Sequence, residues 1–210
     1  MRTRIFFFLS VCSTIGCLSA QDYFPHHNFT FGVGAARPRG DLGSLLKDSP
    51  AISFGYGYRF HRYFQADAGF DMAFGAANVR DYLDTALGPL RIKDREYFIP
   101  LGGRAIAPLL GGRLLFSGGG GGVYMRYAER LRQPSDYYRV DCPVCTARSG
   151  FGYYAQTNLS YFLNRNQNFR VGVTSRVMRG HTSGESLGSV PALETKDHWL
   201  LILGEIGFSF

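Results

Sequence analysis

Two cysteines, Cys142 and Cys145, carry the most visible chemistry in this sequence. Their spacing is shared by thiol–disulfide oxidoreductases, c-type haem attachment sites and half of many zinc sites. A redox pair needs a helix N-terminus beside it, and no helical pattern follows these cysteines. Haem attachment needs a histidine where Thr146 stands, and zinc needs a second pair of ligands. We therefore expect a structural disulfide in an oxidising compartment, with no metal and no cofactor.

Strands are the elements that must position these and all other side chains. Apolar and polar residues alternate with a period of two, most clearly where Phe54, Tyr56 and Tyr58 alternate with Gly55 and Gly57. The same alternation predicts eight strands, over residues 28–37, 50–60, 63–75, 97–107, 114–127, 150–163, 168–180 and 199–210. Short turns and longer polar segments join these strands in strict succession. The expected fold class is all-β, an eight-stranded antiparallel up-and-down transmembrane β-barrel.

The apolar faces of these strands are expected to meet lipid. Aromatic residues would then form two girdles, one of Phe60, Phe64, Tyr161, Phe169 and Phe210, the other of Phe74, Tyr97, Tyr127 and Tyr153. A lipocalin-like soluble barrel, with the apolar face inside, is the alternative that alternation alone leaves open. The aromatic strand ends favour the membrane barrel.

The opposite faces carry charged residues that would point into the lumen. They are Arg59, Asp67, Asp71, Arg104, Arg126, Arg170, Arg176 and Glu205. Eight strands leave an interior that side chains can fill, and buried charges are tolerated only when they are paired or hydrated. We expect a salt-bridged plug with Asp67 and Glu205 as anionic centres. The glycine run 118–122 would give room where large side chains cross the interior.

The N-terminal segment has the features of a signal for export. Arg2 and Arg4 precede an apolar stretch, and Ala20 offers a small residue for cleavage, so residues 1–20 are expected to be a signal peptide and residues 21–210 the barrel domain. Cleavage before Cys17, as in a lipoprotein, is the less favoured alternative. Cleavage after Ala20 would remove two arginines and no acidic residue, which lowers the formal charge from +7 to +5. Charged residues in solvated loops account for this excess, so the charge does not indicate a nucleic-acid partner. No stretch after this segment approaches the ~20 apolar residues of a transmembrane helix.

The final strand ends on an aromatic residue, with Phe208 and Phe210 on its apolar face. This ending, the export segment, the strand count and the succession of loops together resemble the small outer-membrane β-barrel proteins typified by OmpA-like, OmpW-like and opacity-type domains. The resemblance implies a bacterial outer-membrane location, with outer-membrane lipid, lipopolysaccharide and the barrel-assembly machinery as partners. Phe208 and Phe210 would then form the assembly signal.

One short motif is similar to the lipid A deacylase family, whose members are also eight-stranded barrels. The motif is His181-Thr182-Ser183 near the end of the seventh strand, but Gly184 stands where the family usually has asparagine. The resemblance implies His181 as base, Ser183 as nucleophile and Glu194 as orienting acid, all near lipid. We expect instead a polar loop without catalysis.

Three functions remain open at this point. The favoured one is a non-enzymatic barrel with a structural role or an unknown ligand at its surface. The alternatives are a narrow pore for small or apolar solutes and a lipid A deacylase-like hydrolase. Because many activities share this barrel, the fold alone does not choose among them.

Overall fold

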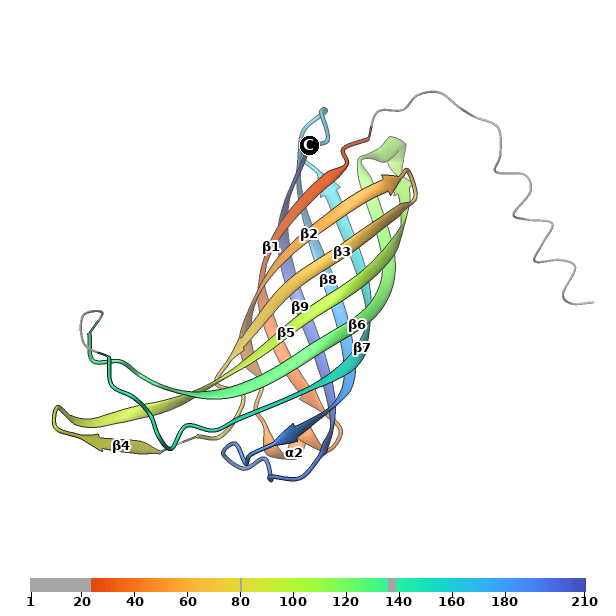
Figure 1. Ribbon diagram of the computed structural model, residues 1–210. Helices are drawn as coiled ribbons and strands as arrows, with labels where there is room; N and C mark the ends of the chain where they lie inside the picture. The colour runs from red at the N-terminus through yellow and green to blue at the C-terminus, as the bar shows by residue number, and fades with distance from the viewer. Residues whose placement is uncertain (1–23, 80, 136–138) are drawn as a thin grey trace, which may run out of the picture.

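Eight long strands close into one antiparallel barrel in the computed structural model, which describes residues 24–79, 81–135 and 139–210 (Figure 1). The barrel strands are β1 (His27–Arg39), β2 (Ser49–His61), β3 (Phe64–Phe74), β5 (Gly88–Leu109), β6 (Leu114–Leu131), β7 (Ala147–Phe162), β8 (Phe169–Gly184) and β9 (Thr195–Ser209). Each strand pairs with the next, and β1 pairs with β9 to close the ring. The expected fold class is confirmed. The export segment 1–20 lies outside the described residues.

The connections differ at the two ends of the barrel. Short turns join β2 to β3, β5 to β6 and β7 to β8, the middle one containing the 3-10 helix η1 (Leu110–Gly112). The C-terminus lies at the same end, which we name the turn end. The opposite end, named the loop end, holds the longer connections, the short helix α2 (Leu42–Leu45) and the strand β4 (Tyr82–Thr85).

Side chains alternate between the outside and the inside of the wall, as strand geometry requires. In β2 the aromatic side chains of Phe54, Tyr56 and Tyr58 are exposed on the outer wall, whereas Ser53 and Arg59 are buried inside. The outer wall is apolar over most of its surface. Its exposed large side chains include Phe29, Phe31, Val33, Leu101, Phe116, Leu159, Val173, Ile202, Ile206 and Phe208.

Strand β6 corrects one expectation. Val123, Met125 and Tyr127 are buried inside the barrel, and Arg126 is exposed on the outer wall. Arg126 therefore does not belong to the lumen charges, and Tyr127 does not belong to an outer aromatic girdle. The interior of the loop end is itself apolar, so an apolar side chain no longer indicates the lipid face there. The preceding glycine run carries no side chains that could fix the parity.

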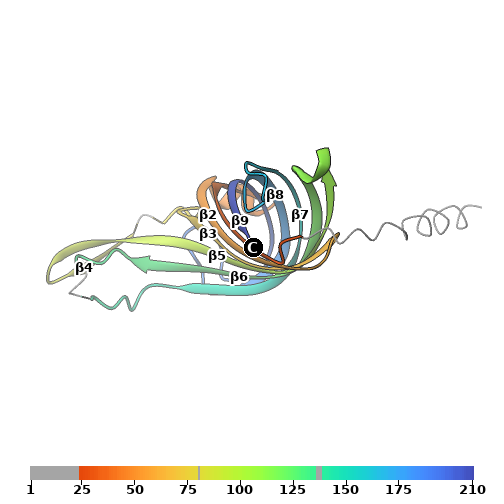
Figure 2. The same cartoon turned by 90° about the horizontal axis from the view of Figure 1, so that it is seen from above.

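Strands β5 and β6 continue past the barrel wall. The predicted strand 97–107 begins much earlier, at Gly88, and β4 pairs with this extension from Tyr82↔Arg91 to Thr85↔Gly88. Both views show the extension, with β4, running sideways from the loop end beyond the other strands (Figure 2). We name β4 together with residues 88–96 and 126–132 the arm.

Within the described ranges, no helix is long and apolar enough to cross a membrane.

Candidate functional site

The interior of the barrel holds a layer of polar side chains around a buried ion pair. Arg176 on β8 pairs with Asp71 on β3, and both side chains are buried. The Arg176 guanidinium also donates hydrogen bonds from Nε and Nη2 to Gln156 Oε1, at 3.1 and 2.9 Å. The guanidinium carbon Cζ of Arg176 also lies over the Tyr154 ring, 5.6 Å from the ring centre. These contacts fix one cation between three strands.

A second ion pair lies in the same layer. Arg104 Nε donates to Asp67 Oδ2 at 2.6 Å, and Gln65 Nε2 donates to Asp67 Oδ1 at 2.6 Å. Gln156 reaches Asp67 as well, through a longer contact of 3.4 Å between Nε2 and Oδ2. Gln156 therefore contacts both the Asp67 pair and the Arg176 pair, which makes one connected network across the lumen.

Towards the turn end the remaining charges have neutral partners. Arg170 Nη1 donates to Asn28 Oδ1 at 2.8 Å and to Ser209 Oγ at 3.2 Å, which ties β8 to the β1–β9 seam. Arg59 Nε donates to the carbonyl oxygen of Arg62 at 3.1 Å. These groups fill space near the turns without forming ion pairs that the structure records.

Glu205 was expected to be an anionic centre of the lumen. It accepts a hydrogen bond from the Asn158 amide at 3.1 Å, and Asn158 also donates to Thr174 Oγ1 at 2.8 Å. Arginine is therefore not its hydrogen-bond partner within the described chain. Of the predicted lumen charges, the structure places on the inward face Arg59, Asp67, Asp71, Arg104, Arg170, Arg176 and Glu205.

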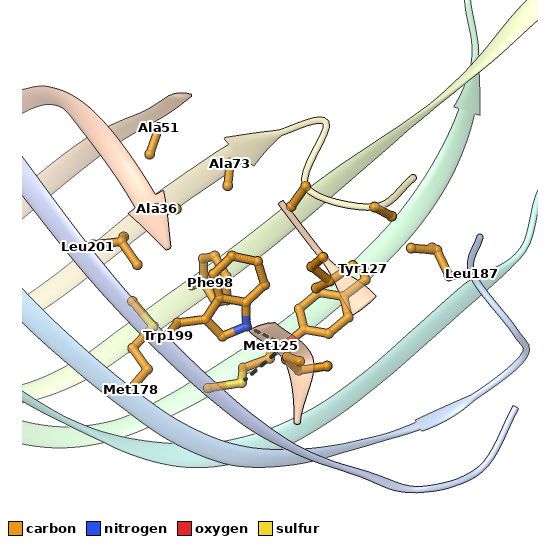
Figure 3. Close-up of a cluster of buried hydrophobic side chains, with 14 of the residues drawn as sticks. Ala36, Ala51, Ala73, Phe98, Met125, Tyr127, Met178, Leu187, Trp199 and Leu201 are labelled. Carbon is orange, nitrogen blue, oxygen red and sulfur yellow. Dashed lines mark hydrogen bonds between the residues drawn. The ribbon is translucent and has the colours of Figure 1, made fainter. Parts of the chain in front are cut away.

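Aromatic side chains fill the interior at the loop end (Figure 3). Trp199, Phe98 and Tyr127 are fully buried, and the Phe98 and Trp199 rings meet edge to face with centroids 5.3 Å apart. Trp199 Nε1 donates to the Tyr127 hydroxyl at 2.9 Å, and that hydroxyl donates to Asp197 Oδ2 at 2.8 Å. Met178 packs in the same cluster. An apolar layer therefore covers the polar layer.

Sequence reasoning did not find this aromatic layer. The signal was present, because Trp199 is the only tryptophan and lies with odd parity on the last strand, opposite to the apolar face of Phe208 and Phe210. Its parity indicates an inward position, and an inward indole needs a hydrogen-bond acceptor.

The cysteine pair forms a disulfide bond between Cys142 and Cys145, with sulfur atoms 2.05 Å apart. Both cysteines pack against the apolar core of the loop end. A cluster of three or more metal-ligating side chains does not occur among the residues that the structure describes.

His181, Ser183 and Glu194 lie on the outer side of the barrel at the loop end. His181 Nδ1 is 3.6 Å from Glu194 Oε1, and both side chains are exposed. Ser183 is opposite Ser149 in the β7–β8 register, and no hydrogen bond joins it to His181 within the described parts of the chain. Because a serine nucleophile is activated by a base within hydrogen-bond reach, the three residues do not form a catalytic triad here.

His181 lines a depression on the outer side of the barrel. A shallow pocket of about 220 Å³ is lined by His181, Arg179, Lys196 and His198, with Phe151 and Tyr153 beside them. Arg179 and Lys196 supply two cations to this pocket, and Ser183 does not line it.

An eight-stranded antiparallel barrel with an apolar outer wall, short turns at one end and long loops at the other has the fold of the small outer-membrane β-barrel proteins. Two of the solved structures that share this fold illustrate the likeness. Neisserial surface protein A has a TM-score of 0.56 at 10% identity, covering 88% of this chain and 97% of that one. The N-terminal β-barrel domain of Pseudomonas aeruginosa OprF has a TM-score of 0.51 at 10% identity, covering 89% and 98%.

Comparisons by sequence give no further relative, because no protein-family model and no curated protein matches the chain.

Proposed function

We propose that this protein is an outer-membrane barrel closed to solutes, which anchors the arm and the loops at the bacterial surface. The filled lumen is the observation that carries the proposal. A polar network crosses the interior and consists of Asp67, Asp71, Arg104, Gln156 and Arg176. The aromatic layer fills the interior between this network and the loop end. An interior of eight strands is just wide enough for its own side chains, and here they meet one another.

The outer wall supports a position in lipid. Exposed apolar patches larger than a few hundred Å² are rare on soluble monomers, and this wall is apolar around most of the barrel. Exposed aromatic side chains lie at the turn end, where a membrane barrel carries an interfacial girdle: Phe60, Phe64, Tyr161, Phe169 and Phe210.

The connections support an orientation. Membrane barrels of bacteria have short periplasmic turns and longer external loops. The turn end, with Phe210, would therefore face the periplasm, where export through a cleaved N-terminal segment delivers the chain to the barrel-assembly machinery. The arm and the Cys142–Cys145 loop would face the exterior.

Conductance across planar bilayers tests the closed lumen. The refolded wild-type barrel, checked for folding by its heat-dependent mobility on gels, is expected to give no steady conductance above the bare bilayer. A variant with Asp67→Ser, Arg104→Ser, Phe98→Ala and Trp199→Ala removes groups from both layers and serves as the opened comparison. A large and steady wild-type conductance would contradict the proposal and favour a pore.

A further inference from the structure

The outer face of β5 and β6 in the arm carries a strip of cations, with Ala128 between Arg126 and Arg130 and the exposed Asp84 of β4 beside it. On β5 the outward positions are taken by Arg91, Lys93 and Arg95, and on β6 and directly after it by Arg126, Arg130 and Arg132, all of them exposed. Lys93 is directly opposite Arg130 in the β5–β6 register, and the Arg132 amide donates to the Arg91 carbonyl oxygen at 2.9 Å. The spacing of the charges is therefore set by paired backbone and not by a free loop.

Acidic residues of the same strands point to the other side. Asp94 and Glu96 are buried, and Asp94 Oδ2 accepts a hydrogen bond from the Ala77 amide at 2.7 Å. Glu129 accepts hydrogen bonds from the Thr146 amide and hydroxyl, at 3.1 and 2.9 Å. Asp94 and Glu129 thereby hold loops onto the barrel. Within the described residues no ion pair joins either carboxylate to a cation of the strip, so the strip keeps a net positive charge.

Two cations of the strip lie over aromatic rings, which indicate how deep in the membrane the strip would be. The Arg95 guanidinium lies 5.9 Å from the centre of the Phe74 ring, and that of Arg130 lies 5.8 Å from the centre of Tyr97. Aromatic side chains of membrane proteins concentrate at the level of the lipid headgroups. The cations that lie over these rings would therefore be at headgroup depth, next to the apolar wall and not far out in solvent.

The strip also borders a concave site. A pocket of about 700 Å³ is lined by Arg95, Arg126, Arg130 and Arg132 and by the loop that carries the disulfide. Arg139 adds a fifth cation to its lining, and Glu129 and Asp141 add two carboxylates, so cations are in excess. This volume lies within the usual range of small-molecule sites. Arg126, which sequence reasoning placed in the lumen, is thus part of an outward basic surface.

We propose that this face binds the phosphate groups of an acylated, phosphorylated glycolipid of the outer leaflet, of the lipid A class. The inference rests on the proposed membrane position. The arm runs sideways from the barrel and not along its axis, so its cationic face can follow the plane of the headgroups. One guanidinium group can donate two parallel hydrogen bonds to two oxygens of the same phosphate group. Arginine side chains therefore suit the phosphomonoesters of such a lipid.

Binding of defined lipids to the detergent-solubilised, folded barrel tests the proposal. Native mass spectrometry would compare diphosphorylated lipid A with its monophosphorylated form and with phosphatidylcholine. The diphosphorylated lipid is expected to bind most tightly. Lys93→Gln with Arg130→Gln removes two neighbouring cations and is expected to weaken that binding by about thirty-fold. Arg113→Gln with Arg165→Gln removes two exposed cations at the turn end and is expected to change it little.

Heat-dependent gel mobility and insertion into liposomes are measured on every variant, so failure to enter a bilayer would count against the membrane position and not against the lipid site. Equal lipid A affinity in the wild type and the Lys93→Gln/Arg130→Gln variant would overturn the proposal. So would equal binding of phosphatidylcholine, or binding of a soluble sulfated oligosaccharide through these residues in place of lipid A.

Discussion

The indole Nε1 of Trp199 donates a hydrogen bond of 2.9 Å to the hydroxyl of Tyr127, which joins β9 to β6 across the interior of the barrel. Tyr127→Phe removes the acceptor and leaves a buried indole N–H without a partner. We expect a loss of about 1–3 kcal/mol in the free energy of unfolding. Urea titration monitored by the fluorescence of this single tryptophan measures the loss directly.

Tyr153→Phe is the matched control for that change, because the Tyr153 side chain is 60% exposed on the outer wall. Its effect should stay within about 0.5 kcal/mol, the usual range for a surface position. Equal losses in the two variants would show that the Trp199–Tyr127 hydrogen bond does not stabilise the aromatic layer.

The Asp71–Arg176 ion pair lends itself to a double-mutant cycle. Removing one partner leaves an uncompensated charge in the interior, so Asp71→Asn and Arg176→Gln should each cost about 3–5 kcal/mol. The double variant should lose clearly less than the sum, because neither charge is then left alone. Urea titrations in the same detergent provide all four corners of the cycle.

An exposed pair provides the comparison. Arg37 and Asp48 form a salt bridge at the loop end with side chains 58% and 53% exposed, and its coupling free energy should stay below about 1 kcal/mol. A coupling at Asp71–Arg176 as small as this would mean that water fills the lumen around those side chains.

Neighbouring glycines of β6 should tolerate alanine very differently. A Cβ atom on Gly121 would lie 2.1 Å from the Leu101 carbonyl oxygen, whereas one on Gly122 would have its nearest neighbour, the Gly152 carbonyl oxygen, at 3.9 Å. Gly121→Ala is therefore expected to cost at least about 1–3 kcal/mol and to reduce the folded fraction, while Gly122→Ala should fold normally. Heat-dependent gel mobility separates folded from unfolded protein, and equal folded yields would contradict the close strand approach.

Incubation with lipid A tests the outer-wall residues at the loop end for catalysis. Because no hydrogen bond joins Ser183 to His181 in the described chain, wild-type protein and Ser183→Ala should leave the fatty acid content of lipid A equally unchanged. Mass spectrometry of the extracted lipid gives the answer. Release of a fatty acid by the wild type alone would establish the hydrolase in place of the binding role.

Deletion of Phe210 should reduce the amount of barrel that assembles in the outer membrane. The Phe210 amide donates to the His27 carbonyl oxygen at 2.9 Å, and the two rings stack with centroids 5.4 Å apart. The deletion removes both contacts and the terminal aromatic residue that the assembly machinery is expected to recognise. Normal abundance of heat-modifiable protein in isolated membranes would contradict this reading.

Alternation of apolar and polar residues was enough to locate the barrel strands. The alternation predicts a strand over residues 50–60, and β2 spans Ser49–His61, because one face of this strand is large and apolar towards the outside and the other carries only small or polar side chains towards the interior. The rule fails in the arm, where Lys93 and Arg95 point outward and Asp94 and Glu96 inward. Because charged residues occupy both faces, apolar and polar residues do not alternate there. The first half of β5 could therefore not be predicted as a strand.

The lumen pairs could be predicted as a set but not partner by partner. Asp71 and Arg176 lie on β3 and β8, which are not neighbours in the sheet, and their meeting depends on the stagger of all the strands between them. Sequence parity fixes only that both point inward. Glu205 shows the same limit, since its partner is the amide of Asn158 and not a cation.

The pairing of β1 with β9 also determines when the barrel can close during synthesis. Asn28 and Ser209 are 181 positions apart, yet they are register partners and share a hydrogen bond of 2.7 Å between their side chains. The barrel cannot close before β9 has been synthesised, and until then the free edge of β1 can pair with another extended chain. Contacts of such long range make folding slow. Survival of the nascent protein should therefore depend on how long that edge is kept unpaired during its passage to the membrane.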